Sequence, residues 1–206
     1  ANFWTEGDNI YDSNAAGMRW GSYSENQLRD YFRKPSPPLE DTRKYIYSNI
    51  GAGMLGHALV RKSGIPLEKL VVDRVCKPLG LNSTSFLIEP TAVGHDTDGN
   101  LANPWPLRDS ILGGAFAMRS TCNDMLTFAQ ANLDPEASPL KKSLQSALMS
   151  RGEINTQEQT CLGWKRNKNG VIYTTGATGG FRCALLIFPP QKTAVVTMSN
   201  TMVGGA

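Results

Sequence analysis

The last fifty residues constrain the fold most, because short apolar runs alternate there with turn residues. Residues 181–188 and 193–199 are predicted to be strands, and Pro189-Pro190-Gln191-Lys192 between them has the composition of a hairpin turn. Residues 162–165 and 171–175 carry two further strand patterns. Consecutive strands joined by short turns pair antiparallel, so the sequence predicts an antiparallel sheet at this end.

The middle of the chain has apolar residues at helical spacing instead. Helices are predicted to begin at Ser24, Ser48 or Asn49, Pro66, Thr121 and Ser138. Two of these starts carry capping signals, Ser24 with Gln27 and Thr121 with Asp124, while Gly113-Gly114-Ala115 is predicted to be a flexible joint. We therefore expect one domain of the α+β class, with residues 1–160 mainly helical and irregular and residues 161–206 forming the sheet.

Charge and composition exclude several classes of function. The chain has 206 residues, with 21 Lys and Arg against 18 Asp and Glu, scattered without a basic stripe. This distribution predicts no nucleic-acid partner, and no apolar run is long enough to span a membrane. The two histidines and four separated cysteines predict no metal, and no nucleotide-binding motif is present. The cysteines are either four separate thiols or include one disulfide. Of the two histidines, His57 is predicted to pack in its helix and His95 to lie in an exposed turn.

Two segments have residue types suited to chemistry. A Tyr-x-Asn at a helix start, Tyr47 to Asn49, places a phenol and an amide on one side of a turn. The small-residue strand around Gly176 lets a substrate approach the backbone, whose N–H groups can face a developing oxyanion. The residues alone favour plainer roles, a helix cap and a strand with a glycine bulge.

These segments belong to a longer series of motifs in a fixed order. The series comprises residues 45–56 with the Tyr-Ser-Asn helix start, 78–84 (PLGLNST), 113–121 (GGAFAMRST), 162–164 (LGW) and 175–181 (TGATGGF). It resembles the serine β-lactamase and penicillin-binding protein family, specifically its class C and esterase-like branch. The resemblance extends over about residues 20–200.

The resemblance implies a β-lactamase/transpeptidase-like fold, incomplete at both ends, in which an antiparallel sheet packs with a helical region. It also implies hydrolysis of a β-lactam, an ester or a D-amino-acid peptide through a serine acyl-enzyme, without metal or organic cofactor. Tyr47 would be the general base or proton shuttle, and Asn49 would orient the substrate. Thr175 and Gly176 would bind substrate at an edge strand, and Ala177 would lend its N–H to the oxyanion hole. The family usually works in the periplasm or outside the cell.

The chain departs from the family at the nucleophile. The family's Ser-x-x-Lys should precede Tyr47, and the one match here, Ser138 to Lys141, follows it and fits a helix cap. The sequence therefore predicts a nucleophilic serine outside this chain, supplied by another segment or another chain.

The chain also departs at Thr174, where the family has Lys or His. Threonine removes a cation that would stabilise a Tyr47 phenolate and help to hold a substrate carboxylate. Arg182, next to Phe181, is a candidate replacement, and an ester or a peptide is favoured over a β-lactam as substrate. Two alternatives remain open, a non-catalytic β-lactamase-like module that binds a peptide, a glycan or a protein partner, and an unrelated α+β domain.

Overall fold

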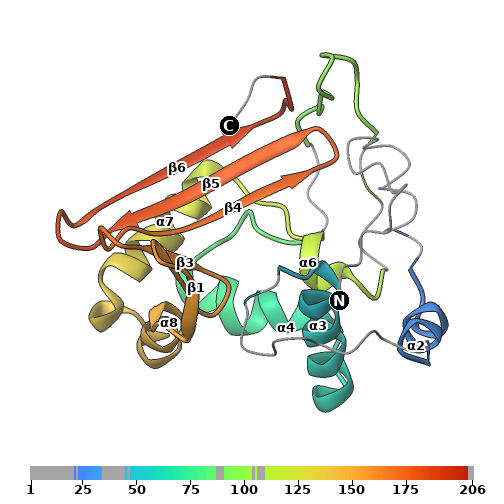
Figure 1. Cartoon of the computed structure of the whole chain (residues 1–206), viewed down its shortest axis with the longest axis horizontal. Helices are drawn as coiled ribbons and strands as arrows, with labels where there is room; N and C mark the ends of the chain where they lie inside the picture. Colours follow the sequence, from blue (N-terminus) through green and yellow to red (C-terminus); the bar gives the residue numbers. More distant parts are fainter. Residues whose placement is uncertain are drawn as a thin grey trace.

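The structure is a computed structural model that describes residues 23–33, 47–86, 91–103 and 110–203, together with Gly21, Tyr45 and Trp105. Its main layer is a six-stranded antiparallel sheet in which the strands follow one another in chain order (Figure 1). The strands are β1 (Gly152–Asn155), β2 (Glu158–Thr160), β3 (Lys165–Asn167), β4 (Ile172–Thr178), β5 (Phe181–Phe188) and β6 (Thr193–Ser199). No helix in the described residues is long and apolar enough to cross a membrane.

The longest strands are joined by tight turns. Gly179 and Gly180 have φ angles of 39° and 89°, and Thr178 pairs with Phe181 across them, as in a two-residue type I′ turn. The predicted strands 181–188 and 193–199 are β5 and β6, and the turn predicted at residues 189–192 joins them. The sheet begins at Gly152, ahead of the predicted boundary at residue 160, because the polar strands β1 and β2 lack an apolar pattern.

Helices make up most of the remaining described chain, apart from loops such as residues 81–86 and 91–103. They are α2 (Glu25–Arg33), α3 (Asn49–Ser63), α4 (Leu67–Val71), the π-helix η1 (Val72–Cys76), α5 (Lys77–Leu79), α6 (Gly113–Phe116), α7 (Cys122–Leu133), the 3₁₀ helix η2 (Pro135–Ala137) and α8 (Lys141–Leu148). The predicted joint at residues 113–115 was wrong, because these residues form α6. The helix predicted from Pro66 is interrupted by the wider turns of η1.

The predicted caps are present. The Ser24 hydroxyl accepts the Gln27 backbone N–H at 3.3 Å, and the Gln27 side chain accepts the Ser24 N–H at 2.8 Å, which is a capping box. The Ser48 hydroxyl accepts the Gly51 N–H at 2.9 Å and begins α3. The Thr121 hydroxyl likewise begins α7 by accepting the Asp124 N–H at 3.3 Å.

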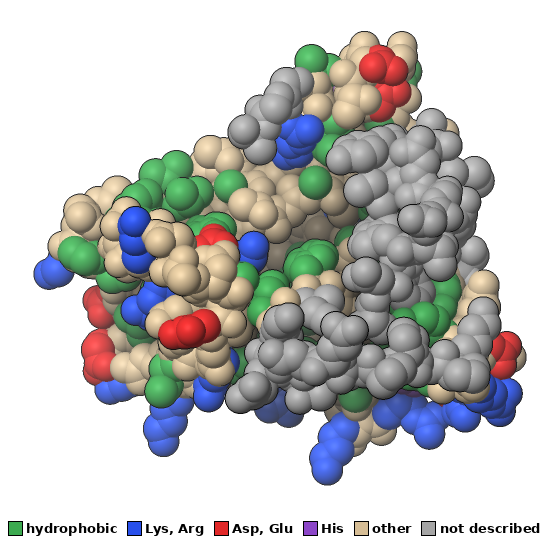
Figure 2. Space-filling model, viewed as in Figure 1, with side chains coloured by type: hydrophobic (Ala, Val, Ile, Leu, Met, Phe, Trp, Pro, Cys, Tyr) green, Lys and Arg blue, Asp and Glu red, His purple; other side chains and the backbone are tan. Residues whose placement is uncertain are grey.

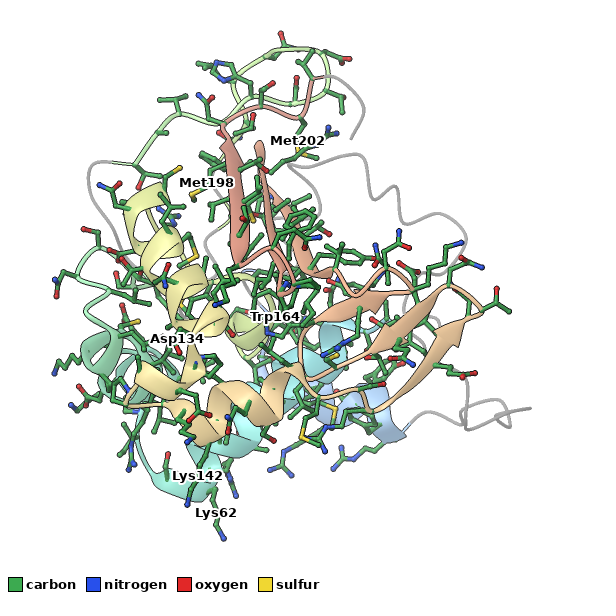
Figure 3. The ribbon with its side chains drawn as sticks, turned by 90° about the vertical axis from the view of Figure 1, so that its left-hand side faces the viewer. Lys62, Asp134, Lys142, Trp164, Met198 and Met202 are labelled. Atoms are coloured by element: carbon green, nitrogen blue, oxygen red, sulfur yellow. The ribbon has the colours of Figure 1, made fainter. Side chains whose placement is uncertain are left out.

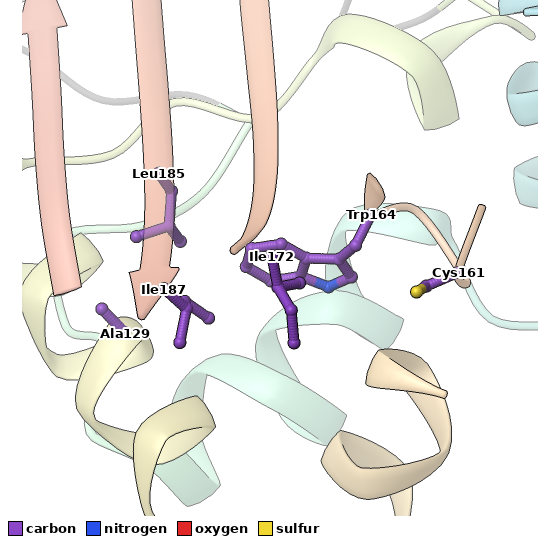
Figure 4. Packing of buried hydrophobic residues seen from close by; sticks show 6 residues of the cluster. All are labelled: Ala129, Cys161, Trp164, Ile172, Leu185 and Ile187. Carbon is purple, nitrogen blue, oxygen red and sulfur yellow. The ribbon is translucent and has the colours of Figure 1, made fainter. Parts of the chain in front are cut away.

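Two hydrophobic clusters support these elements. The helical cluster contains Leu28, Ile50, Phe86, Leu112 and Ala117. The sheet cluster lies between β4–β5 and helices α7 and α8, and Figure 4 shows its members Ala129, Cys161, Trp164, Ile172, Leu185 and Ile187. The Trp164 ring, also labelled in Figure 3, stacks on Phe128 with centroids 6.2 Å apart. All four cysteines are free thiols, and Cys76 and Cys161 are buried.

Candidate active site

The first half of the candidate site is the capped start of α3. Because Ser48 caps the helix, Tyr47 lies just outside it and Asn49 is its first residue. The Tyr47 side chain is 68% exposed, whereas Ile50 in the next turn is buried in the helical cluster. In Figure 1 this end of α3 points toward the strands. An exposed phenol and a partly buried amide therefore lie at the end of α3 that points toward the strands.

A row of small residues holds α3 close to α6. A Cβ on Gly53 would lie 2.5 Å from Leu112 Cδ2, and a Cβ on Gly114 would lie 2.8 Å from the Ala52 carbonyl oxygen. A Cβ on Gly56 would lie 3.1 Å from the Gly114 Cα. Glycines at these positions let the two helices approach to backbone contact, so they fix how far the start of α3 extends toward the sheet.

The second half of the candidate site is the C-terminal part of β4. β3 pairs with β4 only at Tyr173 and Ile172, so among the described strands residues 174–178 pair with β5 alone. Residues 175–177 are exposed. This stretch is therefore an edge whose backbone a ligand can approach.

The register sets the direction of the β4 side chains. Ile172 is buried in the sheet cluster, and successive side chains alternate, so Thr174 and Gly176 lie on the same, helix-facing side. Gly176 faces Cys183, and a Cβ there would lie 2.9 Å from its sulfur. Burial raises the pKa of the Cys183 thiol, partly opposed by a hydrogen bond from the Gly176 backbone. The close approach of Cys183 thus by itself favours glycine at position 176.

Arg182 lies on the other side of the sheet. It pairs with Ala177 on β4 and with Ser199 on β6, so its side chain projects opposite to Thr174 and Gly176. The structure therefore does not bring Arg182 together with Thr174. Arg182 projects away from the side on which a Lys or His at position 174 would lie, although it was the candidate replacement for that cation.

The sequence did not single out three ionisable groups that influence one another, Glu158, Tyr173 and Tyr45. The Glu158 carboxylate on β2 accepts a hydrogen bond from the Tyr173 hydroxyl, which raises the pKa of Tyr173 to about 12. Burial first, and then the charges of Tyr47 and Glu158, raise the pKa of Tyr45. Tyr45 is therefore within electrostatic reach of both Tyr47 and Glu158.

The surface between these halves is hollowed. Figure 2 shows a recess between the strands and the helices with hydrophobic side chains inside it. In the described residues, no group of three His, Cys, Asp or Glu side chains is arranged to hold a metal ion.

Ser138 and Lys141, the one Ser-x-x-Lys match in the sequence, have contacts of their own away from the candidate site. The Ser138 hydroxyl accepts the Leu140 N–H at 3.2 Å, and the Lys141 ammonium pairs with Glu136. Ser138 borders a groove of about 490 Å³ between α5 and α7, next to Asp134, which Figure 3 labels. None of the predicted site residues lines this groove. The serine and lysine thus serve a turn and an ion pair, as their place beside a helix start predicts.

Sequence comparison identifies relatives of this chain. The family described as Beta-lactamase matches residues 7–206. A beta-lactamase of Yersinia enterocolitica is 26% identical over 221 residues, which cover 85% of this chain and 56% of the relative. The D-alanyl-D-alanine-carboxypeptidase/endopeptidase AmpH of Escherichia coli K12 is 24% identical over 71% of this chain and 42% of its own length. The chain thus spans 56% of the first relative's length and 42% of the second's.

Solved structures have the same fold. A class C beta-lactamase superimposes with a TM-score of 0.75 at 19% identity, covering 87% of this chain and 58% of that one. The Beta-Lactamase/D-Alanine Carboxypeptidase of Pseudomonas syringae gives 0.75 at 20% identity, with 86% and 60% covered. With a family match over nearly the whole sequence and this shared fold, the chain belongs to the beta-lactamase family.

Proposed function

We propose that the intact protein is a serine hydrolase that forms an acyl-enzyme from a β-lactam, an ester or a D-amino-acid peptide. The observation that carries this proposal is the family match over residues 7–206, which includes both the Tyr47–Asn49 helix start and the accessible edge of β4. A phenol, an amide and an accessible strand backbone are then available to one bound acyl group. A periplasmic or secreted location is part of the proposal.

Each group has a role that its position supports. Tyr47 is exposed and free to move a proton between the nucleophile and the leaving group. Asn49, fixed in the first turn of α3, orients the substrate amide and the lysine of the family. Thr175 and Gly176 bind the substrate along the strand edge, and the Ala177 N–H stabilises the oxyanion.

The nucleophile of the proposed enzyme lies outside residues 1–206. Ser138 already caps a turn and Lys141 pairs with Glu136, so this pair does not supply the family's Ser-x-x-Lys. The relatives are longer than this chain, which covers 56% of the Yersinia beta-lactamase. A further segment, or a second chain, would contribute the serine at the recess between α3 and β4.

Labelling the intact protein tests the activity. We expect one covalent adduct with a fluorophosphonate or a penicillin, detected by intact mass and mapped by peptide sequencing. Tyr47→Phe should slow labelling by about 100-fold because the proton transfer is lost, while Tyr31→Phe and Ser138→Ala should label normally. An unlabelled intact protein would instead favour a non-catalytic module that binds a peptide, a glycan or a protein.

Thr174 favours a substrate that does not need a carboxylate anchor. The helix-facing side chains of β4 are Ile172, Thr174, Gly176 and Thr178, none of them charged, and Arg182 projects from the other side. We therefore expect neutral esters or peptides to be turned over better than carboxylated β-lactams. Thr174→Lys should raise kcat/KM for a carboxylated ester relative to its neutral analogue, and an unchanged ratio would contradict this preference.

A further inference from the structure

The two halves of the candidate site belong to different hydrophobic clusters. Ile50, next to Asn49 in α3, is buried in the helical cluster, whereas Ile172, at the start of β4, is buried in the sheet cluster. Ala177 lies near the other end of β4, beside the turn that leads into β5. The spacing between the start of α3 and Ala177 therefore depends on the contacts that join the helical cluster to this turn.

Trp105 makes such a contact. Its ring packs against the helical cluster and lies edge-to-face on Phe116 of α6, with the ring centroids 5.8 Å apart and the ring planes at 80°. The pyrrole edge of the same ring lies against Gly179, because a Cβ on that glycine would be 2.9 Å from Trp105 Cδ1 and 3.2 Å from Nε1. One partly buried indole thus lies between α6 and the β4–β5 turn and touches both.

The two ends of this contact lead to the site residues. On the sheet side, Gly179 follows Ala177 by two residues, and Ala177 is joined to the turn by the pairing of β4 with β5. On the helical side, Phe116 belongs to α6, and a Cβ on Gly114 of that helix would lie 2.8 Å from the Ala52 carbonyl oxygen of α3. Because closely packed elements transmit displacement, a change at the indole reaches both halves of the site.

The other contacts of the turn hold it to the sheet. The Gly180 carbonyl accepts the His95 N–H at 3.3 Å, and the same N–H reaches the Asn200 carbonyl at 2.9 Å, so these bonds fasten the turn to the chain after β6. Gly94, on the same loop as His95, lies so close that a Cβ there would be 2.8 Å from the Gly179 carbonyl oxygen. These contacts fix the turn within the sheet, whereas the indole fixes it relative to α6.

We propose that Trp105 is a positioning residue of the proposed active site: its indole sets the spacing between the β4–β5 turn and α6, and thereby between the Ala177 N–H and the start of α3. This role rests on the proposed hydrolase function. Trp105 acts through Gly179 and Phe116 and not on the substrate directly. The oxyanion donor and the groups at the start of α3 must meet one acyl group, so a displacement of about 1 Å slows the reaction strongly.

Exchanges of tryptophan for leucine in the intact protein test this role by turnover of p-nitrophenyl acetate. Trp105→Leu removes the ring between α6 and the turn, Trp105→Phe keeps a ring there, and Trp164→Leu makes the same exchange inside the sheet cluster as the matched control. We expect Trp105→Leu to lower kcat about tenfold with little change in KM, and Trp105→Phe to keep most of kcat. Trp164→Leu should lower Tm but leave kcat within about twofold.

Two glycines provide variants in which the indole stays. Gly179 and Gly170 both have positive φ angles, 39° and 79°, so alanine is strained at either position. Gly179→Ala also places a methyl group against the indole, whereas nothing lies within 4 Å of the methyl group of Gly170→Ala. We expect Gly179→Ala to lower kcat about tenfold and Gly170→Ala to leave kcat within about twofold, which tests the role even where Trp105→Leu does not fold.

A double-variant comparison tests the contact without turnover. The methyl group of Gly179→Ala meets the indole in the wild-type background, and Trp105→Leu removes that obstacle. The fall in Tm that Gly179→Ala causes should therefore be at most about half as large in the Trp105→Leu background as in wild type.

Each outcome decides one point. Equal falls in Tm in the two backgrounds would overturn the contact between Trp105 and Gly179, and the proposal with it, whatever the activity. Coupled falls with kcat unchanged in Trp105→Leu would reduce the indole to a structural brace, and an equal loss of kcat in Trp164→Leu would do the same. Coupled falls in a protein that turns over no ester and binds no fluorophosphonate would instead refute the proposed function, and this role would lose its basis.

Discussion

At the scale of single residues, Asp124 joins segments far apart in the chain. It lies in the first turn of α7, is 8% exposed, and accepts the Ser83 N–H at 2.8 Å and the Thr84 hydroxyl at 2.6 Å. Asp124→Ala would leave both donors without their acceptor in a buried place. We expect the free energy of unfolding to fall by about 2–4 kcal/mol, measured by chemical denaturation.

The neighbouring Asn123 provides the control for this prediction. Its side chain is exposed, and the Thr127 hydroxyl bonds only its backbone carbonyl. Asn123→Ala should therefore change stability by no more than about 0.5 kcal/mol. Equal losses in the two variants would mean that the long-range bonds of Asp124 contribute nothing beyond the helix start.

The residue scale also marks how far sequence reasoning reaches. The Thr121 cap was predicted because a capping signal spans only three positions. The hydrogen bonds that Asp124 accepts from Ser83 and Thr84, and the one that Glu158 accepts from Tyr173, depend on tertiary contact or strand pairing, which no local pattern contains. The roles of Tyr47, Asn49 and residues 174–177 stay predictions, since their motifs indicate them and only an assay tests them.

At the scale of elements, the glycines of α3 differ in what surrounds them. A Cβ on Gly53 would lie 2.9 Å from the Leu112 Cα, whereas a Cβ on Gly51 would meet only Ser48 at 3.4 Å. Alanine favours a helix over glycine by about 0.5–1 kcal/mol, so Gly51→Ala should stabilise slightly. Gly53→Ala should instead destabilise by about 1–3 kcal/mol, because α6 must move away.

Thermal unfolding of the two variants checks this contrast. A rise in Tm for Gly51→Ala beside a fall for Gly53→Ala is the expected result. Two increases would show that α3 and α6 are not in backbone contact. For Gly53→Ala we also expect slower labelling by the fluorophosphonate, since the start of α3 would shift relative to β4.

The η1 segment gives a prediction about pH. Hydrogen bonds from the ammonium groups of Lys69 and Lys77 hold the Asp73 pKa at about 2, below its ordinary value of 3.8. A carboxyl whose pKa is lower in the folded state stabilises the fold above its unfolded pKa, and this contribution disappears as the pH falls through the folded pKa. The Tm difference between wild type and Asp73→Asn should therefore be constant above about pH 4 and vanish near about pH 2.

Salt provides the control in this case. Asp73 and both lysines are exposed enough for counterions to screen them, so about 1 M salt should shrink the Tm difference at neutral pH. A difference that persists at low pH and in high salt would assign the effect of the substitution to helix propensity instead.

Helices and strands with a clear pattern of apolar residues could be predicted from the sequence, and those made mostly of polar or small residues could not. The strands β5 and β6 match their predicted bounds because long apolar runs end at turn residues. The strands β1 to β3 carry mostly polar residues, so only pairing with their neighbours identifies them. The short helix α6 contains two glycines, and its formation depends on contact with α3, which a local pattern cannot show.

At the scale of the whole molecule, residues 91–103 connect the helical region to the sheet. The His95 N–H bonds the Gly180 and Asn200 carbonyls, and its ring Nδ1 lies 3.1 Å from the Asn200 oxygen. His95 was predicted to be exposed, but these contacts leave it partly buried. A local turn signal reveals neither partner, since both lie about a hundred residues away.

This connection predicts unequal effects for two glycines of similar conformation. Gly180 and Gly170 have φ angles of 89° and 79°, so alanine at either is strained by about 1–2 kcal/mol. A Cβ on Gly180 would also lie 2.7 Å from the His95 nitrogen, while nothing lies within 4 Å of one on Gly170. Gly180→Ala should therefore lose about 1–3 kcal/mol more in chemical denaturation than Gly170→Ala.

Hydrogen exchange adds a spatial check. In Gly180→Ala the backbone amides of His95 and Met202 should exchange faster, since their bonds depend on this junction. Faster exchange confined to the β4–β5 turn would mean that residues 91–103 are held in place by other contacts.

The row of small residues between α3 and α6 has a consequence for how such a protein diversifies. Asn49 is the first residue of α3 and Tyr47 lies just before it, and the position of this helix is set by residues such as Gly53, Gly56 and Gly114. Replacing one of these small residues by another would shift α3 relative to α6 and change the width of the proposed site. In the proposed hydrolase, substrate preference can thus change during evolution without a substitution at a residue of the site itself, and searches for selectivity variants should include the residues between α3 and α6.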